Sequence, residues 1–302
     1  SEMCIRDSIY VAGAYRADGF IAKYNKYGTK LWMRVLGSRD TASISGISAS
    51  NDGSIFVVGA NATRSSFIAK YNSSGGKLWA QEIDSAGKDV ATGVAVAGDG
   101  SIYVAGTTDG HLDDQVAIGG QDIFLIKYYP DGVKAWTRML GSRAEDYSSK
   151  ITAASDGSIY VTGSTFGHLD GQKYSGEGDA FIVKYNSDGT KGWTQLVGST
   201  EIDSGRGIAL ADNAHIYIAG STTGSLDGER ASGFNADAFV SKVTFDDHEG
   251  DRPLDGYTGH VVYGQSTNDD LYGEDKDDTL YGGDGNDRLV GQAGYDLLIG
   301  DS

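Results

Sequence analysis

The sequence predicts an all-β protein of β-propeller blades, about four and a half of them in an open or partial propeller, followed by a short parallel β-roll. Three observations predict this fold. The 302 residues include 45 glycines and 2 prolines, a composition that favours many tight turns. A unit of about fifty residues recurs between residues 8 and 245, and a nine-residue period follows in the C-terminal tail.

The longer repeat contains short apolar segments that read as strands. The first returns as SIYVAG at Ser8, SIFVVG at Ser54, SIYVAG at Ser101, SIYVTG at Ser158 and HIYIAG at His215. A second follows in each copy, as in DGFIAKYN and DAFIVKYN. A third contains all four tryptophans, Trp32, Trp79, Trp136 and Trp193, at spacings of 47, 57 and 57 residues. We interpret the tryptophan as a core residue that fills the gap between neighbouring blades.

A fourth segment precedes each new copy, as in ISGISASNDG, ATGVAVAGDG and SSKITAASDG. Its Asn/Asp-Gly pair predicts a two-residue hairpin turn. Four short antiparallel strands per unit are typical of a propeller blade. The first copy lacks its leading strand and the fifth lacks its tryptophan strand. We therefore expect an open arc or a piece of a larger propeller.

The stretch DGSIYVTGSTFG, followed by GDAFIVKYNSDGTKGWTQLVGS, resembles the bacterial β-propeller repeat often called the SBBP repeat. The resemblance covers about Ser8 to Phe245, where five copies align. It implies a propeller in an exported or surface protein. It implies no particular activity.

The last three copies have a longer link between the first and second strands. These links share Gly-x-Leu-Asp, with Asp113, Asp170 and Asp227, and a second aspartate two residues before the aromatic, at Asp122, Asp179 and Asp237. Two aspartates converging on a glycine-rich loop would suit calcium. The alternative is that they form turns and cap strand ends. His111 and His168 recur in register with Ser225, which favours loop packing over metal ligation.

The net charge of −17 is unevenly placed: fifteen acidic and three basic residues give the segment from Asp246 to Ser302 a charge of −12. This balance argues against nucleic acid or an anionic membrane as partner, and it suits cations. No apolar run approaches the length of a membrane span. The single cysteine, Cys4, allows no intrachain disulfide and carries no functional weight.

Catalytic motifs are missing from the sequence, which contains no GxSxG, HExxH, phosphate-loop or GxGxxG pattern. The five histidines are scattered and neighbour no obvious nucleophile: His111, His168, His215, His248 and His260. Residues that repeat in every blade are explained more simply by architecture than by one active site. We therefore expect a non-catalytic protein with no catalytic residues.

The tail divides without gaps into GQSTNDDLY, GEDKDDTLY, GGDGNDRLV and GQAGYDLLI, beginning at Gly264, Gly273, Gly282 and Gly291. The sixth position is always aspartate, at Asp269, Asp278, Asp287 and Asp296, and the eighth is always leucine, at Leu271, Leu280, Leu289 and Leu298. Glycines permit a turn with positive φ, and the leucine forms a thin core. Carboxylate and carbonyl oxygens are hard ligands that suit calcium.

This pattern resembles the RTX, or haemolysin-type, calcium-binding repeat from Gly264 to Gly300. GGDGNDRLV fits GGxGxDxUx at every position, whereas Thr267 and Lys276 replace the fourth-position glycine, and Gln265, Glu274 and Gln292 replace the second. An earlier unit, DGYTGHVVY from Asp255, has Val262 in the leucine column but His260 in the aspartate column, so we expect a cap without calcium.

The resemblance implies Ca²⁺ as the cofactor and a metal site in the last repeats. The residues predicted to hold calcium are Asp269, Asp278, Gly282, Asp284, Gly285, Asp287, Gly291, Ala293, Gly294 and Asp296. Because nine-residue half-turns alternate sides, each ion should lie between units two apart. That arrangement pairs Asp269 with Asp287, and Asp278 with Asp296.

Four segments follow from these patterns. Residues 1–7 match no later repeat, and we interpret them as a non-native N-terminal stretch. Residues 8–245 form the propeller, 246–254 an acidic connector and 255–302 the β-roll. No export signal follows the final IGDS, and the chain starts within a repeat, so we expect a piece of a longer protein.

The function predicted from the sequence is that of an exported calcium-binding repeat protein with a non-catalytic binding, adhesion or structural role. The propeller loops would present a site for a surface protein or glycan, and the tail would fold on calcium. The alternative is a secreted enzyme, for example one that acts on polysaccharide, with the propeller as its catalytic or accessory module. The RTX resemblance implies an extracellular or cell-surface location reached by type I secretion.

Overall fold

The computed structural model describes residues 8–15, 18–36, 43–60, 65–85, 87–172, 174–211, 215–226 and 236–244, together with five three-residue strands between positions 261 and 299. The chain divides into two compact units, Ser1–Val243 and Thr244–Ser302. The first is the propeller unit and the second is the tail unit.

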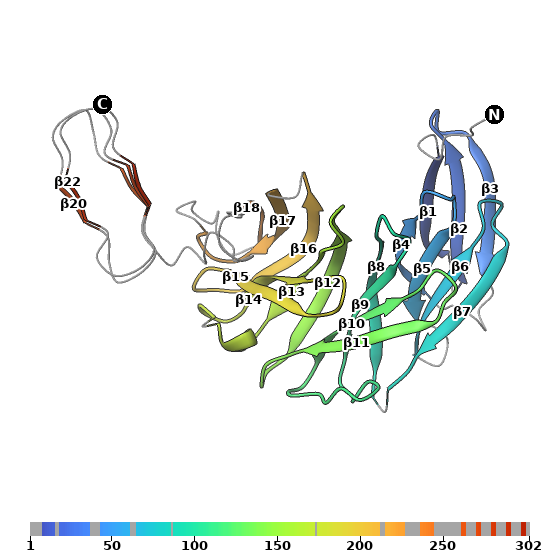
Figure 1. Ribbon diagram of the computed structural model, residues 1–302, viewed down its shortest axis with the longest axis horizontal. Helices are drawn as coiled ribbons and strands as arrows, with labels where there is room; N and C mark the ends of the chain where they lie inside the picture. Colours follow the sequence, from blue (N-terminus) through green and yellow to red (C-terminus); the bar gives the residue numbers. More distant parts are fainter. Residues whose placement is uncertain are drawn as a thin grey trace. The chain divides into compact units, whose positions relative to one another are not determined.

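The propeller unit contains five separate antiparallel sheets (Figure 1). In each sheet the spatial order of the strands follows the order of the chain, which is the arrangement of a propeller blade. The strands of the first and second sheets are β1 (Ser8–Tyr15), β2 (Asp18–Asn25) and β3 (Lys30–Leu36), then β4 (Ser43–Ala49), β5 (Ile55–Ala60), β6 (Ser66–Tyr71) and β7 (Lys77–Ile83).

The third sheet is formed by β8 (Asp89–Val96), β9 (Ile102–Thr108), β10 (Asp122–Tyr128) and β11 (Lys134–Leu140). The fourth is formed by β12 (Asp146–Ala153), β13 (Ile159–Thr165), β14 (Asp179–Tyr185) and β15 (Lys191–Val197), with the short 3₁₀ turn η2 (Leu169–Gly171) between β13 and β14. The fifth is formed by β16 (Asp203–Leu210), β17 (His215–Thr222) and β18 (Asp237–Thr244).

The sheet sizes confirm the predicted incomplete copies. The first and fifth sheets have three strands each, whereas the three between them have four. The first sheet begins at the position of a second blade strand, and the fifth ends before a tryptophan strand. Among the described strands no pairing joins these two sheets.

The core lies between neighbouring sheets. Along β10, Phe124 and Ile126 pack with residues of the second sheet, whereas Ile123 and Leu125 pack with residues of the fourth. This alternation follows from the two-residue period of a strand, and it buries both faces of the sheet. Burying side chains of this size stabilises a fold by about 1.5–3 kcal/mol each.

The tryptophan strands connect each sheet to the next one along the chain. A side-chain Cβ added at Gly189 would lie 2.9 Å from Trp136 Cε2, which shows how closely the indole of the third sheet covers the turn of the fourth. The Nε–H of Arg138 donates to the carbonyl of Gly189 at 2.8 Å. Trp79 covers Gly132, and Trp32 covers Gly75, in the same way. Trp32, Trp79 and Trp136 therefore fill equivalent gaps between sheets.

The hairpin turns differ from the predicted two-residue type. The N–H of Ala97 donates to the carbonyl of Ser101 at 2.9 Å and that of Gly100 to the carbonyl of Ala97 at 3.0 Å, which closes a three-residue loop. Of the three loop residues only Gly100 has a positive φ, 84°, whereas a two-residue type I′ turn needs two such residues. The longer turn is favoured because Asp99 Oδ1 accepts the N–H of Ser101 at 2.9 Å.

The tail unit contains five strands of three residues that recur every nine positions. They are β19 (Val261–Tyr263), β20 (Asp270–Tyr272), β21 (Thr279–Tyr281), β22 (Arg288–Val290) and β23 (Leu297–Ile299). They form two parallel sheets, β19-β21-β23 and β20-β22, so each strand pairs with the strand two repeats away. This pairing confirms that successive half-turns alternate sides.

Candidate functional site

The predicted calcium residues of the tail lie outside the described residues. Asp269, Asp278, Gly282, Asp284, Gly285, Asp287, Gly291, Ala293, Gly294 and Asp296 all belong to the segments between the described strands. The described strands fix the register: Leu271 lies opposite Leu289, and Leu280 lies opposite Leu298. The leucine column of the sequence is therefore the middle position of every strand, with Val262 in the same column.

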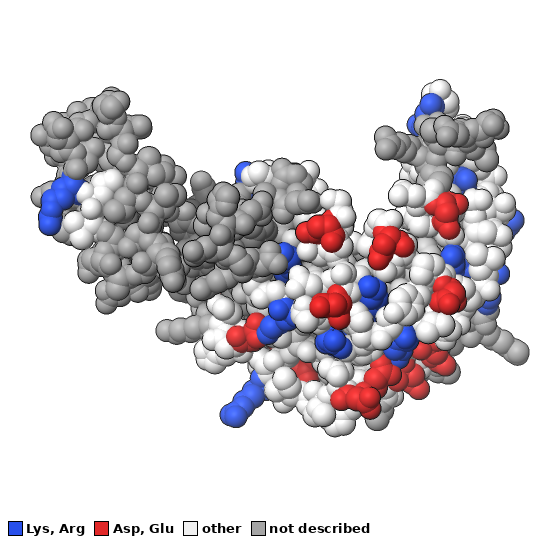
Figure 2. All heavy atoms as spheres, in the orientation of Figure 1, with Lys and Arg blue, Asp and Glu red and all other residues white. Residues whose placement is uncertain are grey.

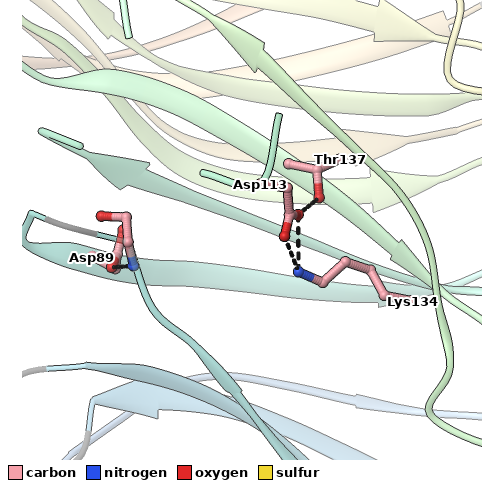
Figure 3. A network of polar contacts seen from close by, with 5 residues as sticks. Asp89, Asp113, Lys134 and Thr137 are labelled. Atoms are coloured by element: carbon pink, nitrogen blue, oxygen red, sulfur yellow. Dashed lines mark hydrogen bonds and ion pairs between the residues drawn. The ribbon is translucent and has the colours of Figure 1, made fainter. Parts of the chain in front are cut away.

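The loop aspartates of the propeller unit bind side chains of their own sheet. Asp113, at φ 53°, accepts from Lys134 Nζ at 2.8 and 2.9 Å and from the hydroxyl of Thr137 (Figure 3). Asp170, at φ 55°, forms the equivalent ion pair with Lys191. Asp227, in the third copy, lies outside the described residues. The leucine of each Gly-x-Leu-Asp motif is buried and anchors the loop.

The second set of loop aspartates caps the turn that precedes each strand. Asp122 Oδ2 accepts the N–H of Ile118 at 2.5 Å, and Asp179 Oδ2 accepts the N–H of Ser175 at 2.8 Å. Both side chains are buried, and their Oδ1 atoms have no hydrogen-bond partner among the described residues. Burial raises the pKa of Asp179 to about 6, and the nearby carboxylate of Asp203 adds to the shift.

A third set of aspartates begins the first strand of successive sheets and was not singled out from the sequence. Asp89, Asp146 and Asp203 stand 57 residues apart, and that spacing is a sequence signal that would have found them. Each accepts the N–H of a serine four residues earlier, as Asp146 Oδ2 does from Ser142 at 2.5 Å. Burial raises the pKa of Asp146.

These contacts favour the capping interpretation of the loop carboxylates over the calcium interpretation. Asp113 and Asp122 belong to one loop, yet the first binds Lys134 and the second binds backbone N–H groups. Within the part of the chain that the structure describes, no three His, Cys, Asp or Glu side chains are grouped so that they could hold a metal ion. Asp237 begins β18 at the position equivalent to Asp122 and Asp179.

The two loop histidines have different environments. His111 Nδ1 accepts the N–H of Ala117 at 2.9 Å, which packs its loop as predicted. His168 is exposed and lies edge-on to Tyr174, with ring centroids 5.0 Å apart. Both histidines are exposed, and each contacts a residue of its own loop: His111 a backbone N–H and His168 an aromatic ring.

His168 and Tyr174 line a cleft of about 900 Å³ at the junction of the third and fourth sheets, which we call the 3/4 cleft. Its lining comes from the end of β11 and the loop after it (139–144), the loop after β13 (166–168 and 170–171), and Ile118, Tyr174 and Lys191. Sequence reasoning missed Phe166 and Arg143. The available signal was the aromatic in STFG, where the neighbouring copies have TTDG and STTG.

A second, smaller hollow of about 320 Å³ lies among the first strands of successive sheets. It is lined mainly by glycine and aliphatic residues of β4, β8 and β12. Lys150 crosses it and donates to the carbonyl of Ser45 at 3.4 Å. This hollow offers few groups that would orient a ligand.

Charges of both signs are interspersed over the face of the propeller unit that Figure 2 shows. Several acidic side chains gather along one edge of that face. Within the described residues, no helix is long and apolar enough to cross a membrane.

The fold and the repeats define a class: an all-β protein in which propeller blades precede calcium-binding nonapeptide repeats. Residues 263–298 match the model of the RTX calcium-binding nonapeptide repeat, in four copies. Such repeats bind calcium and are typical of secreted proteins. Residues 154–191 match a β-propeller domain of unknown function, DUF5122. This is a different propeller family from the SBBP repeat, and it agrees with the predicted fold.

A curated protein similar to part of this chain is the regulatory protein FlaEY of Caulobacter vibrioides, 28% identical over 130 residues. That match covers 40% of this chain and 14% of FlaEY, so the chain spans a small part of that relative.

Solved structures with a similar arrangement include a protein of unknown function from Bacteroides caccae, with a TM-score of 0.46 and 16% identity over 80% of this chain and 74% of that one. Others are the lignostilbene dioxygenase of Pseudomonas brassicacearum (TM-score 0.42, 12% identity, 84% and 65% covered) and a GH43 endo-arabinanase of Bacillus licheniformis (0.40, 12%, 82% and 93%). Likenesses at this level carry no argument about activity.

Proposed function

We propose that this chain is an exported calcium-binding protein whose tail folds on calcium outside the cell and whose propeller unit binds a surface ligand without catalysis. The observation that carries the proposal is the nine-residue repeat of the tail. Its strands pair with those two repeats away, in the register of the leucine column. Such a roll brings the aspartate columns of alternate repeats next to one another.

The register supports the proposed pairing of calcium ligands. Asp270 lies opposite Arg288 in the β20-β22 pair, and positions 269 and 287 directly precede these two residues in the chain. Thr279 lies opposite Leu297, so positions 278 and 296 adjoin the second pair. We assign one calcium ion to Asp269 with Asp287 and another to Asp278 with Asp296, with carbonyls of the glycine turns completing each shell.

Electrostatics explains why the tail needs the ion. Its segment from Asp246 carries −12 of the net charge, and its core is one leucine or valine for every nine residues. So thin a core does not offset chain entropy and self-repulsion without a cation. Extracellular calcium sites have dissociation constants of about 10⁻⁴–10⁻³ M, which leaves such a site empty in the cytosol and filled after export.

Hydrogen–deuterium exchange of the full chain tests the proposal. Calcium should slow exchange in peptides covering 261–299, magnesium should not, and peptides covering 102–128 should be insensitive to both. Asp287→Ala with Asp296→Ala should abolish the protection. Asp247→Ala with Asp251→Ala is the matched control, because it removes the same charge outside the roll. Protection that is already complete in chelator would refute calcium-dependent folding.

The contacts of the propeller carboxylates support the non-catalytic role. Those with raised pKa values are buried and bonded to backbone N–H groups, so a substrate would not reach them. A screen against chromogenic glycans tests the enzyme alternative: turnover that disappears in Asp170→Asn would establish it. Type I export is tested by deleting the type I exporter in the source bacterium, after which the protein should remain inside the cell.

A further inference from the structure

The 3/4 cleft combines aromatic walls with an apolar floor. Phe166 is half-buried and lies edge-on to Tyr147, with ring centroids 6.2 Å apart and an interplanar angle of 87°. Tyr174, also half-buried, is fixed against His168. Met139 and Leu140 supply apolar surface beneath them. Aromatic and apolar walls with a few polar groups at the rim are typical of small-ligand sites.

The rim of the cleft is basic within an acidic protein. Arg143 is exposed and has no hydrogen bond or ion pair among the described residues. Among the lining residues Lys191 and Asp170 form an ion pair that neutralises both, so Arg143 leaves the lining with a charge of +1, whereas the chain carries −17. The neighbouring carboxylate of Glu145 is outside the lining and accepts from the N–H of Gln121 and the hydroxyl of Tyr147. A free guanidinium presents a planar set of donors that matches a carboxylate. The cleft therefore suits a ligand with an apolar ring face and a carboxylate.

The next junction shows that the fold does not require these side chains. The equivalent 4/5 cleft, about 510 Å³, is lined by Ser175, residues 198–201 and residues 223–225. Its backbone bonds are the same: the N–H of Phe166 donates to the carbonyl of Glu145 at 3.0 Å, and that of Thr223 donates to the carbonyl of Ile202 at 3.0 Å.

The side chains at equivalent positions nevertheless differ between the two clefts. Arg143 corresponds to Thr200, Ala144 to Glu201, Phe166 to Thr223 and His168 to Ser225. One backbone thus carries aromatic and basic residues at one junction, and hydroxyl and acidic residues at the other. Because the same backbone accepts different side chains at the two junctions, the fold does not require the aromatic and basic side chains of the 3/4 cleft. They are therefore free to serve binding.

Hydrogen bonding in the walls favours a sugar over an extended peptide. Several backbone N–H groups of both walls are already bonded internally, including those of Ser142 to Asp146 and Gly167 to Thr165. A peptide that adds to a sheet as a strand binds largely through main-chain hydrogen bonds, which such walls cannot easily offer. Recognition would fall to side chains, and a sugar ring presents an apolar face to an aromatic and hydroxyls to the rim.

We propose that the 3/4 cleft binds an acidic oligosaccharide, one whose sugars carry carboxylates. Phe166 and Tyr174 stack against sugar rings, and Arg143 pairs with a carboxylate. This inference rests on the binding role proposed above for the propeller, and it names the class of ligand.

Calorimetric titration of the full chain tests the inference with three acidic probes, the oligomers of galacturonate, of mannuronate and of hyaluronan. Neutral galactose oligomers and hexaglutamate serve as comparisons. At least one acidic oligosaccharide should bind ten or more times tighter than either comparison. Arg143→Gln should weaken that binding at least tenfold. Arg143→Thr with Phe166→Thr, which installs the residues of the 4/5 cleft, should abolish it.

The matched control is Thr200→Ala with Thr223→Ala at the 4/5 cleft, which should leave the affinity unchanged. Equal binding of the neutral oligomer, preference for hexaglutamate, no binding of any acidic probe, or full affinity in Arg143→Gln would each overturn the inference. Titrations in chelator separate this site from the tail, because binding in the cleft should persist without calcium. Binding that requires calcium would also overturn it. If calcium fails to slow hydrogen exchange in the tail, only the calcium proposal is overturned.

Discussion

Replacing Gly189 by alanine should destabilise the propeller unit more than the same change at Gly28. Both glycines occupy the same hairpin position, at φ +85° and +79°. An L-residue in this conformation costs about 1–2 kcal/mol at either site. At Gly189 the new Cβ would also lie 2.9 Å from Trp136 Cε2 and 3.0 Å from Cδ2, whereas at Gly28 nothing lies within 4 Å. Overpacking of this kind adds about 1–3 kcal/mol.

The expected difference is therefore about 2 kcal/mol, or roughly 4–8 °C in the melting temperature of a unit this size. Differential scanning calorimetry of the two variants measures it, and tryptophan fluorescence reports the same transition. Gly28→Ala is a matched control because entropy lost from the unfolded chain is equal in both variants and cancels. Equal destabilisation by the two changes would show that the indole does not hold the turn, and the account of how sheets are joined would fail.

Three further outcomes follow from the charges and the tryptophans. Burial raises the pKa of Asp179 to about 6, so proton uptake stabilises the folded state below that pH and this gain is lost as pH rises from about 4 to 6. The free energy of unfolding of Asp179→Asn, relative to that of the parent chain, should therefore be highest near pH 7.5. It should fall by up to about 3 kcal/mol by pH 4, measured by urea unfolding across pH. Partial burial would raise the pKa of Asp99, but hydrogen bonds from Ser101 lower it. Asp99→Ala should therefore reduce the free energy of unfolding by about 1 kcal/mol at pH 7 and by less at pH 3. A loss of stability that does not change with pH would argue against this account. All four tryptophans belong to the propeller unit, so calcium removal should change far-ultraviolet circular dichroism while leaving tryptophan emission unchanged.

Local patterns predicted the strands of both units well, because each period reflects a local geometric constraint. Alternation in DIFLIKY places Phe124 and Leu125 on opposite faces, and two different sheets bury them. The nine-residue period positioned every strand of the tail, with Val262 at the centre of β19 and Leu271, Leu280, Leu289 and Leu298 at the centres of the other four. The turn type was wrong because Asn-Gly and Asp-Gly pairs serve two kinds of hairpin. The hydrogen bond from the N–H of Ser101 to Asp99 Oδ1 favours the longer loop.

The loop carboxylates illustrate where sequence reasoning had to stop. Gly-x-Leu-Asp followed by a second aspartate is equally compatible with a calcium-binding loop and with two aspartates that form turns and cap strand ends. The choice depended on Lys134, which lies 21 residues beyond Asp113 and reaches it only after β11 folds alongside the loop. The 57-residue spacing of Asp146 from its equivalents is visible in the sequence, but its partner, the N–H of Ser142, is a feature of the folded turn.

By itself the sequence determined the all-β class, the incomplete blades at both ends, and the calcium-binding repeats of the tail, because periodicity and ligand spacing are properties of consecutive residues. Only the tertiary structure decided how the propeller aspartates are used and where a ligand cleft opens. Arg143, Phe166 and Lys191 are up to 48 residues apart and belong to no common motif. They line one cleft because the third and fourth sheets pack face to face, and that packing is decided by side chains distant in the chain.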